Sequence, residues 1–482
     1  MTIKTDVFFL KINKLGGDIE KVSLLSYPKK LKSLKPFNLL KTSSKFIYNA
    51  QSGIIGKNGI DNIKNKRPFY KTINNFYKLK KNKNKIIVPM IYISNKGIIY
   101  KKTFVFYRGE FLVNVNYLIN NFSNYPIKIK FIFQLKQTID IKKKEKLGIK
   151  NCNINTYRGT SYSTDKYKYK KYSFDEIKKS NLLLKTKSGW ITMMQRYFIT
   201  SWIPKINGKK IFYTRNSING NAYIGYKSNN FIINDGNKKT FSSILWIGPK
   251  IIDKMSFISN NLVLTVDYGY FWFISKFLLN ILKLINIYIK NFGFSLIIIT
   301  FVVRLIIYPI NKIQYTYISK INLLQNKINK INKKFKNDKN KQRKNIINFY
   351  KKEKINPFKS FLSVIIQIPI FISLYNMIVY SIELRHANFI FWIKDLSSYD
   401  HYYILPILMG ITNFFVQKLY PNKNYNLNKK KNINLIPIIF TLFFLCLPSG
   451  LIIYYIISNQ ITILQQKFIY KIFIKNKLNN KK

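Results

Sequence analysis

Histidine and cysteine are nearly absent from this 482-residue sequence, which contains two of each. His386 and His401 are too few for a histidine-based metal centre, and Cys152 and Cys446 lie in segments of very different character. We therefore expect no metal, no cofactor and neither a disulfide framework nor a cysteine-based centre. The strings GxxxxGK[ST], HExxH and GxSxG are also missing, so nucleotide hydrolysis and the common hydrolase reactions have no support, and we predict that the protein is not an enzyme.

Acidic residues are scarce as well. The chain has 18 Asp plus Glu against 83 Lys plus Arg, a formal net charge of +65. Such an excess ordinarily indicates nucleic acid or an anionic membrane as a partner. Lysine is abundant everywhere, however, together with Asn, Ile, Tyr and Phe, which indicates a compositional bias of the whole chain. The charge is therefore informative only where its density changes sharply.

The first 258 residues lack any apolar run of 18 residues. Short runs alternate apolar and polar side chains between turn signals, as half-buried strands do. In Thr103–Ile119, alternating residues flank an Arg-Gly-Glu turn, which predicts a hairpin. Similar runs recur at 85–94 and 222–234. We predict a large antiparallel β-sandwich for residues 1–258.

From residue 269 to residue 290 the pattern has helical spacing. Lysines and an asparagine form one polar stripe, and Trp, Phe, Leu and Ile fill the rest. This pattern predicts a linker and an amphipathic helix over 259–290 that lies in a membrane interface. The alternative is a buried helix packed on the sheet.

Five apolar segments occupy the remainder, residues 291–482, and we predict that each crosses a membrane. They are 291–311, 361–382, 402–416, 433–447 and 451–464, the last two separated by Pro-Ser-Gly. Segments 312–357 and 418–431 and the tail 467–482 are strongly basic, whereas 385–401 is balanced. Because basic loops remain inside, this pattern predicts five spans with the β domain outside and the C-terminus inside.

Arg304 lies within the first span, where a permanent charge costs several kcal/mol unless it faces water, a partner or the interface. Further polar residues occur in the spans, and such groups normally face a bundle interior or a wet cavity: Thr300, Gln367, Asn376, Asn413, Gln417, Tyr454, Tyr455, Ser458, Asn459 and Gln460. Two alternatives remain. The amides can form ordinary interhelical hydrogen bonds, and the arginine can extend to the cytoplasmic headgroups.

The basic loop 312–357 contains helical apolar spacing on both sides of a polar turn at Asn337-Asp338. This predicts an antiparallel helical hairpin that projects into the cytoplasm. Its lysines can contact ribosomal RNA, or they can simply be solvated.

Four strings carry a resemblance to a known family: VDYGYFWFISK, GFSLIIITFVVRLIIYP, YYILPILMGIT and LPSGLIIYYIISN. They resemble the YidC/Oxa-type membrane protein insertases, bacterial YidC branch, and the likeness extends over almost the whole chain. It implies a periplasmic β-sandwich, an interfacial helix and five spans around a groove open to the cytoplasm and lipid. It also implies a multi-pass protein of the bacterial inner membrane that inserts nascent membrane proteins, alone or with the Sec translocase.

The resemblance assigns roles to individual residues. The groove arginine of the family corresponds to Arg304, its nearby threonine to Thr300 and its tyrosine in the last span to Tyr455. We add Gln367 and Tyr454 as further polar groove candidates. The substrate-contact positions of the second core span correspond to a hydrophobic slide made of Ile365, Ile368 and Phe371.

The chain departs from the family in two places. The Gly-Gly-Cys-Phe-Pro run before the second core span is replaced by Lys359–Ser363, which removes the cysteine and the flexible turn. The family also begins with a signal-anchor helix, and residues 1–30 contain no continuous apolar span. We expect that the start is truncated or misassigned.

The resulting hypothesis is that a wet groove shortens the apolar distance that a substrate must cross, while Arg304 attracts its acidic flank. Two other functions remain open. One is a channel or solute transporter, although no internal repeat is visible. The other is an accessory chaperone subunit of the Sec complex without activity of its own.

Overall fold

The computed structural model describes residues 1–31, 33–61, 67–139, 156–205, 208–335, 338–353, 362–418 and 435–479. The described residues form two compact units, and the boundary between them along the chain falls between Val266 and Asp267. The sequence analysis placed the corresponding boundary eight residues earlier, after residue 258.

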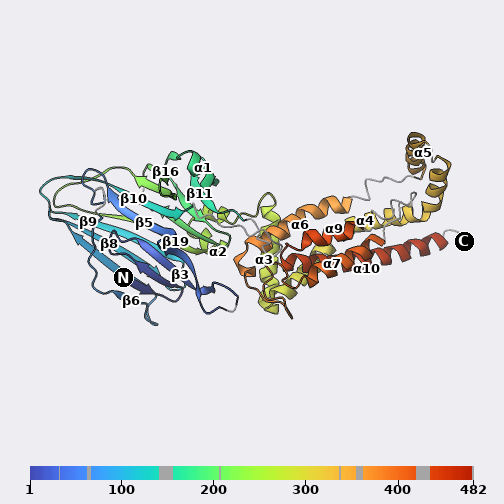
Figure 1. The fold of residues 1–482 in the computed structure, drawn as a ribbon, viewed down its shortest axis with the longest axis horizontal. Coiled ribbons are helices and arrows are strands. Elements are labelled where there is room, and N and C mark those ends of the chain that lie inside the picture. Colours follow the sequence, from blue (N-terminus) through green and yellow to red (C-terminus); the bar gives the residue numbers. More distant parts are fainter. Residues whose placement is uncertain are drawn as a thin grey trace. The chain divides into compact units, whose positions relative to one another are not determined.

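The N-terminal unit contains two β-sheets (Figure 1). The 11-stranded sheet consists of β1 (Thr2–Lys4), β2 (Phe8–Ile12), β3 (Ile19–Pro28), β4 (Pro36–Thr42), β5 (Ile47–Ile55), β6 (Phe76–Lys78), β10 (Ile127–Thr138), β13 (Leu183–Thr186), β16 (Lys210–Ser217), β17 (Asn221–Ser228) and β18 (Phe231–Ile233). The 8-stranded sheet consists of β7 (Lys85–Ile93), β8 (Ile98–Tyr107), β9 (Leu112–Asn121), β11 (Gly159–Thr164), β12 (Lys170–Ser173), β14 (Gly189–Met194), β15 (Phe198–Pro204) and β19 (Lys238–Pro249). Short helical segments α1 (Phe174–Lys179), α2 (Ile252–Ser256) and η2 (Asn260–Thr265) complete the unit.

The predicted hairpin is confirmed as β8 and β9. These strands pair antiparallel, with Phe104 opposite Val115 and Phe106 opposite Val113, and all four side chains are buried. Gly109 in the connecting turn has a φ of +71°, a conformation that glycine adopts without steric cost.

Aromatic residues from both sheets meet in one core. Phe131 of β10 lies 4.0 Å from Phe241 of β19, and Phe133 of β10 lies 5.0 Å from Trp202 of β15, measured between ring centroids. Alternation along each strand directs these side chains to the shared interior. The large antiparallel sandwich predicted from the sequence is therefore confirmed.

The C-terminal unit is helical. It contains α3 (Trp272–Ile289), α4 (Phe292–Lys334), α5 (Lys339–Lys352), α6 (Leu362–Tyr380), η4 (Ile382–Leu384), α7 (Ile404–Lys418), α9 (Leu435–Phe444) and α10 (Ser449–Asn479). In the described part of the chain, two helical stretches are long and apolar enough to cross a membrane, 272–289 and 292–321, and two shorter apolar stretches are 365–380 and 404–418. The five predicted spans fall on α4, α6, α7, α9 and α10.

Two of these helices are longer than the apolar segments indicate. Helix α4 does not end at residue 311: it is 43 residues long and continues to Lys334, through the first half of the predicted hairpin. Helix α10 likewise continues through 467–479, which the sequence analysis assigned to a tail. Tyr315 and Ile318 of α4 pack with Ile469 of α10 in one buried cluster. This packing stabilises both extensions beyond the apolar segments.

Helix α3 packs against α4 and α6 and leaves most of its aromatic residues exposed. Trp272, Phe273 and Phe277 are each more than half exposed, while Leu278, Leu279 and Leu282 are buried. These exposed side chains do not fit the alternative of a buried helix packed on the sheet. An exposed apolar face suits a helix in contact with lipid.

Helix α5 runs back along the end of α4 (Figure 1). Asp338 caps the N-terminus of α5 by accepting hydrogen bonds from two backbone N–H groups, each at 3.0 Å. Gln342 Nε2 donates to Asn332 Oδ1 at 2.9 Å, and Lys320 Nζ donates to the carbonyl of Glu353 at 2.7 Å. The described parts of 312–357 thus form two adjacent helices.

Some predictions lie partly outside the described residues. Residues 359–361 of the family departure and most of the basic loop 418–431 are among them. So is Cys152. Cys446 is disulfide-bonded, so the expectation of no disulfide is wrong for this residue.

Candidate functional site

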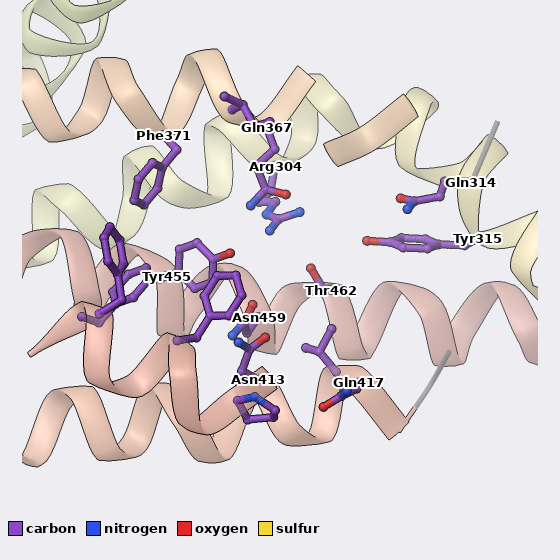
Figure 2. Close-up of a pocket in the computed structure, with 16 residues that line it drawn as sticks. Arg304, Gln314, Tyr315, Gln367, Phe371, Asn413, Gln417, Tyr455, Asn459 and Thr462 are labelled. Atoms are coloured by element: carbon purple, nitrogen blue, oxygen red, sulfur yellow. The ribbon is translucent and has the colours of Figure 1, made fainter. Parts of the chain in front are cut away.

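A cavity of about 630 Å³ opens among α4, α6, α7, α9 and α10 (Figure 2). Its lining combines polar and apolar side chains: Arg304, Gln314, Tyr315, Gln367, Ile368, Phe371, Asn413, Val416, Gln417, Pro437, Phe440, Phe443, Phe444, Tyr455, Asn459 and Thr462. None of these residues is acidic. Arg304 is therefore the only charged side chain in the described lining of the cavity.

Arg304 points from α4 toward the cavity and α10 (Figure 2). Only 5% of the residue is exposed. Its Nε donates to Ser458 Oγ at 2.7 Å, and its Nη2 donates to the same oxygen. No salt bridge involves Arg304 among the residues with described side chains. Among the described residues, one neutral oxygen thus accepts from a guanidinium that has five N–H donors and cannot lose its proton. The alternative in which this side chain extends toward headgroups does not fit its burial against Ser458.

Neutral polar groups form the wall across from the arginine. Asn413 and Gln417 lie one turn apart on α7, and Asn459 and Thr462 lie about one turn apart on α10 (Figure 2). Asn459 Nδ2 donates to Thr412 Oγ1 at 3.2 Å, which ties the two helices together beside the cavity. Amides both donate and accept, so this wall suits water or peptide groups.

Aromatic rings enclose one end of the cavity. Tyr455 meets Phe371 with ring centroids 6.0 Å apart and Phe444 at 5.2 Å, and Phe371 lies 6.1 Å from Phe444. Gln314, Tyr315 and Gln417 lie at the other end (Figure 2). The cavity is therefore polar at one end and aromatic at the other.

The predicted site residues divide into two groups. Arg304, Gln367, Ile368, Phe371 and Tyr455 line the cavity, whereas Thr300, Tyr454 and Ile365 do not. The Thr300 hydroxyl is fully buried and donates to the carbonyl of Leu296 at 2.6 Å. Tyr454 is 1% exposed, and Ile365 is 62% exposed on the surface of α6.

Two span amides have ordinary structural partners. Asn376 of α6 donates to the carbonyl of Tyr268, in the segment before α3, at 2.8 Å. Asn459 of α10 donates to Thr412 of α7, so the interhelical hydrogen-bond alternative fits Asn459.

Sequence reasoning missed Gln314, Tyr315 and Thr462 and assigned no role to Ser458. A signal for Tyr315 was present, because it lies eleven residues after Arg304, about three helical turns later and on the same face. The signal went unused because the first helix was expected to end at residue 311. On α10, Tyr455, Ser458, Asn459 and Thr462 follow the spacing of one helical face.

The described residues contain no group of three or more His, Cys, Asp or Glu that could hold a metal ion. The chemistry of the site is therefore that of one cation, neutral amides, hydroxyls and aromatic rings.

Comparisons with known proteins divide the chain into two matched parts. A family model described as "YidC periplasmic domain" matches residues 1–281, and one described as "60Kd inner membrane protein" matches residues 284–477. Among solved structures, an active YidC insertase with its first transmembrane domain resolved is 14% identical, with a TM-score of 0.41 over 96% of this chain and 93% of that chain. A galactose mutarotase related enzyme from Lactobacillus acidophilus is 8% identical, with a TM-score of 0.32 over 51% of this chain and 96% of that chain.

Proposed function

Because this chain belongs to the YidC-type family of 60Kd inner membrane proteins, which are membrane protein insertases and not enzymes, we propose that it inserts its substrates through the cavity beside Arg304. The single observation that carries this proposal is the state of that arginine. It is buried and permanently charged, it adjoins open volume, and no carboxylate lines the described cavity. A charge in that state attracts an anionic group from outside the fold.

The first step is the capture of a polar flank. A new membrane segment must carry its outer flank across hydrocarbon, which costs about 3 kcal/mol for each charge near the bilayer centre. A wet cavity that reaches part of the way shortens this distance. Arg304 pairs with an acidic flank, and the neutral wall of Asn413, Gln417 and Asn459 takes the place of water around the backbone.

The second step places the apolar part of the substrate against α6. Ile368 and Phe371 line the cavity, and Ile365 is exposed one turn before Ile368. These residues form the hydrophobic slide, from which the segment leaves sideways into lipid. Burial of the apolar segment supplies the driving force, so no nucleotide is consumed.

The proposed topology follows from charge. Helices α4, α6, α7, α9 and α10 cross the inner membrane, with the hairpin 312–357 and the basic end 467–482 in the cytoplasm and residues 1–258 in the periplasm. Residues 259–290 lie at the interface, and 291–482 form the insertase core. The basic hairpin contacts the translating ribosome, and the Sec translocase shares some substrates.

Reconstitution of the purified full chain in lipid vesicles tests the proposal. A short single-span substrate with an acidic flank is added, and insertion is measured as protection from external protease. Insertion without other proteins supports the proposal. Flux of small solutes without insertion indicates a channel, and neither activity indicates an accessory subunit; both outcomes contradict it.

A further inference from the structure

Helix α3 is joined to α6 by a series of polar contacts, which we call the α3 clamp. The hydroxyl of Ser275 in α3 donates to the carbonyl of Ser373 in α6 at 2.9 Å, and both serines are fully buried. Just before α3, the carbonyl of Tyr268 accepts from Asn376 Nδ2 at 2.8 Å. The Tyr268 hydroxyl also lies 3.0 Å from Ser381 Oγ.

An ion pair closes the other end of the clamp. Lys283 Nζ of α3 lies 2.8 Å from Glu383 Oε1, which follows α6 in η4. The two side chains are 28% and 19% exposed, so the pair is partly shielded from solvent. The polar contacts therefore extend along more than two turns of α3, from residue 275 to residue 283.

The clamp lies on the side of α6 that faces away from the cavity. A helix turns by about 100° per residue, so Ser373 and Asn376 are rotated by roughly 200° and 140° from Phe371. Ile368 and Phe371 line the cavity on the opposite side. A shift of α3 that moves the clamp thus moves the cavity wall.

Helix α6 has an internal reason to need such support. Pro369 lies inside the helix, between Ile368 and Phe371. Proline removes one helical hydrogen bond and weakens the helix at that point. One turn after the proline, the Ser373 hydroxyl donates to the Pro369 carbonyl at 2.7 Å, and the Ser373 carbonyl accepts from the Ser275 hydroxyl of α3.

We propose that α3 is a brace for α6, and that Ser275, Asn376 and the Lys283–Glu383 pair are positioning residues that fix the cavity wall. The inference rests on the proposed function for the role of that wall. Its mechanical part, the dependence of the wall on α3, is independent of any substrate.

A charge-swap experiment tests the brace in the full chain. A cysteine is substituted at Ile368, with Cys152 and Cys446 replaced by serine, and its labelling rate with a water-soluble maleimide is measured in lipid vesicles without substrate. Lys283→Glu and Glu383→Lys are each expected to change that rate by up to about fivefold, the largest shift in equilibrium that a partly exposed ion pair supports. The double variant, Lys283→Glu with Glu383→Lys, restores the pairing and is expected to restore the rate.

Two further variants keep the test informative if a charge reversal impairs folding. Ser275→Ala removes one hydrogen bond with little change in volume and is expected to shift labelling in the same direction. Lys276→Glu changes an exposed lysine next to Ser275 and is expected to leave the rate unchanged. Unchanged labelling in Lys283→Glu, Glu383→Lys and Ser275→Ala, or altered labelling that persists in the charge-swapped double variant, overturns the brace. Because no substrate is present, this result is separate from failure of the insertion assay, which concerns the proposed function alone.

Discussion

Arg67 in the β unit and Arg304 in the helical unit are both largely withdrawn from solvent, but the fold satisfies them differently. Arg67 Nε donates to Asp61 Oδ1 at 2.9 Å, Nη1 pairs with Asp18, and Nη2 donates to the carbonyl of Ser52 at 2.9 Å. Gly16 makes this possible, because a Cβ there would lie 2.2 Å from the guanidinium carbon. Arg304, by contrast, has one described acceptor, the hydroxyl of Ser458.

The difference indicates what each arginine does. Two carboxylates neutralise Arg67, so the fold itself accounts for the cost of burying it. The charge of Arg304 has no such compensation among the described residues, and open volume lies beside it. The first arginine is therefore structural, and the second retains a capacity for an external anion.

The largest effect is expected from removing Arg67 from its contacts with Asp18 and Asp61. Arg67→Leu leaves Asp18 and Asp61 buried without their cation, which is expected to lower the free energy of unfolding of the β unit by about 3–5 kcal/mol. Denaturant unfolding of the full chain in detergent, followed by tryptophan fluorescence, measures the loss, since Trp190, Trp202 and Trp246 are buried in this unit.

Arg215→Leu is the matched control for this first prediction. Arg215 is exposed and stacks over Tyr223 with its guanidinium carbon 4.6 Å from the ring centroid. Its loss is expected to cost less than about 1 kcal/mol. Equal destabilisation by the two variants would contradict a special role for the Arg67 network.

Removing the charge of Arg304 is expected to lower insertion activity and to leave the stability of the β unit unchanged. Arg304→Ala should lower insertion of substrates with an acidic flank about a hundredfold, because the flank charge then crosses hydrocarbon without a partner. Protease protection in vesicles measures this loss. Retained activity in Arg304→Lys would show that charge alone suffices, whereas full activity in Arg304→Ala refutes the attraction step.

Removing the Ser458 hydroxyl, which accepts from Arg304, is expected to have a smaller effect on insertion. Ser458→Ala leaves the charge in place but frees the guanidinium, and insertion of acidic substrates should fall roughly tenfold. Ser458→Thr keeps the hydroxyl and should retain most activity. A substrate with a neutral flank serves as the internal reference. An equal loss for both substrates would indicate general damage to the bundle.

The smallest predicted effect concerns Lys102, whose titration makes the stability of the β unit depend on pH. Burial lowers the pKa of Lys102 to about 7, although its Nζ donates to the carbonyls of Gly16 and Gly17 at 3.1 and 2.8 Å. Between this value and the unfolded pKa near 10.5, the unfolded chain binds more protons, so stability rises with pH. The unfolding free energy of the β unit should increase by about 1 kcal/mol between pH 7 and 8.

A variant isolates the contribution of Lys102. Lys102→Met should flatten the rise in stability above pH 7, as measured by denaturant unfolding at several pH values. A wild-type profile that falls over this range, or one that Lys102→Met leaves unchanged, contradicts the assignment.

The sequence revealed one of these two arginines and not the other. Arg304 was identifiable because a charge inside an apolar run has a cost that must be met locally. Arg67 carried no such signal, since it does not lie in an apolar run and one of its two carboxylate partners, Asp18, is 49 residues away in the sequence. The hairpin of β8 and β9 was predictable because its pattern and turn are local.

Only part of the cavity lining was predictable from the sequence. Apolar content indicated the helices, but Gln314 and Tyr315 lie beyond the apolar segment, where hydropathy no longer reports the helix. The bond between Arg304 and Ser458 depends on how α4 packs on α10, which spacing along one helix cannot determine. Thr300 and Tyr454 were expected to line the groove and instead lie in the packed interior.

The central claim, that the charge of Arg304 selects acidic flanks, is tested most directly by comparing two substrates that differ only in Asp against Asn in the outer flank. Insertion of both is measured with the wild-type chain and with Arg304→Gln in the same vesicles. The account predicts that the wild type favours the Asp substrate and that Arg304→Gln loses this preference. An Asp-to-Asn insertion ratio that is the same for both proteins would contradict it.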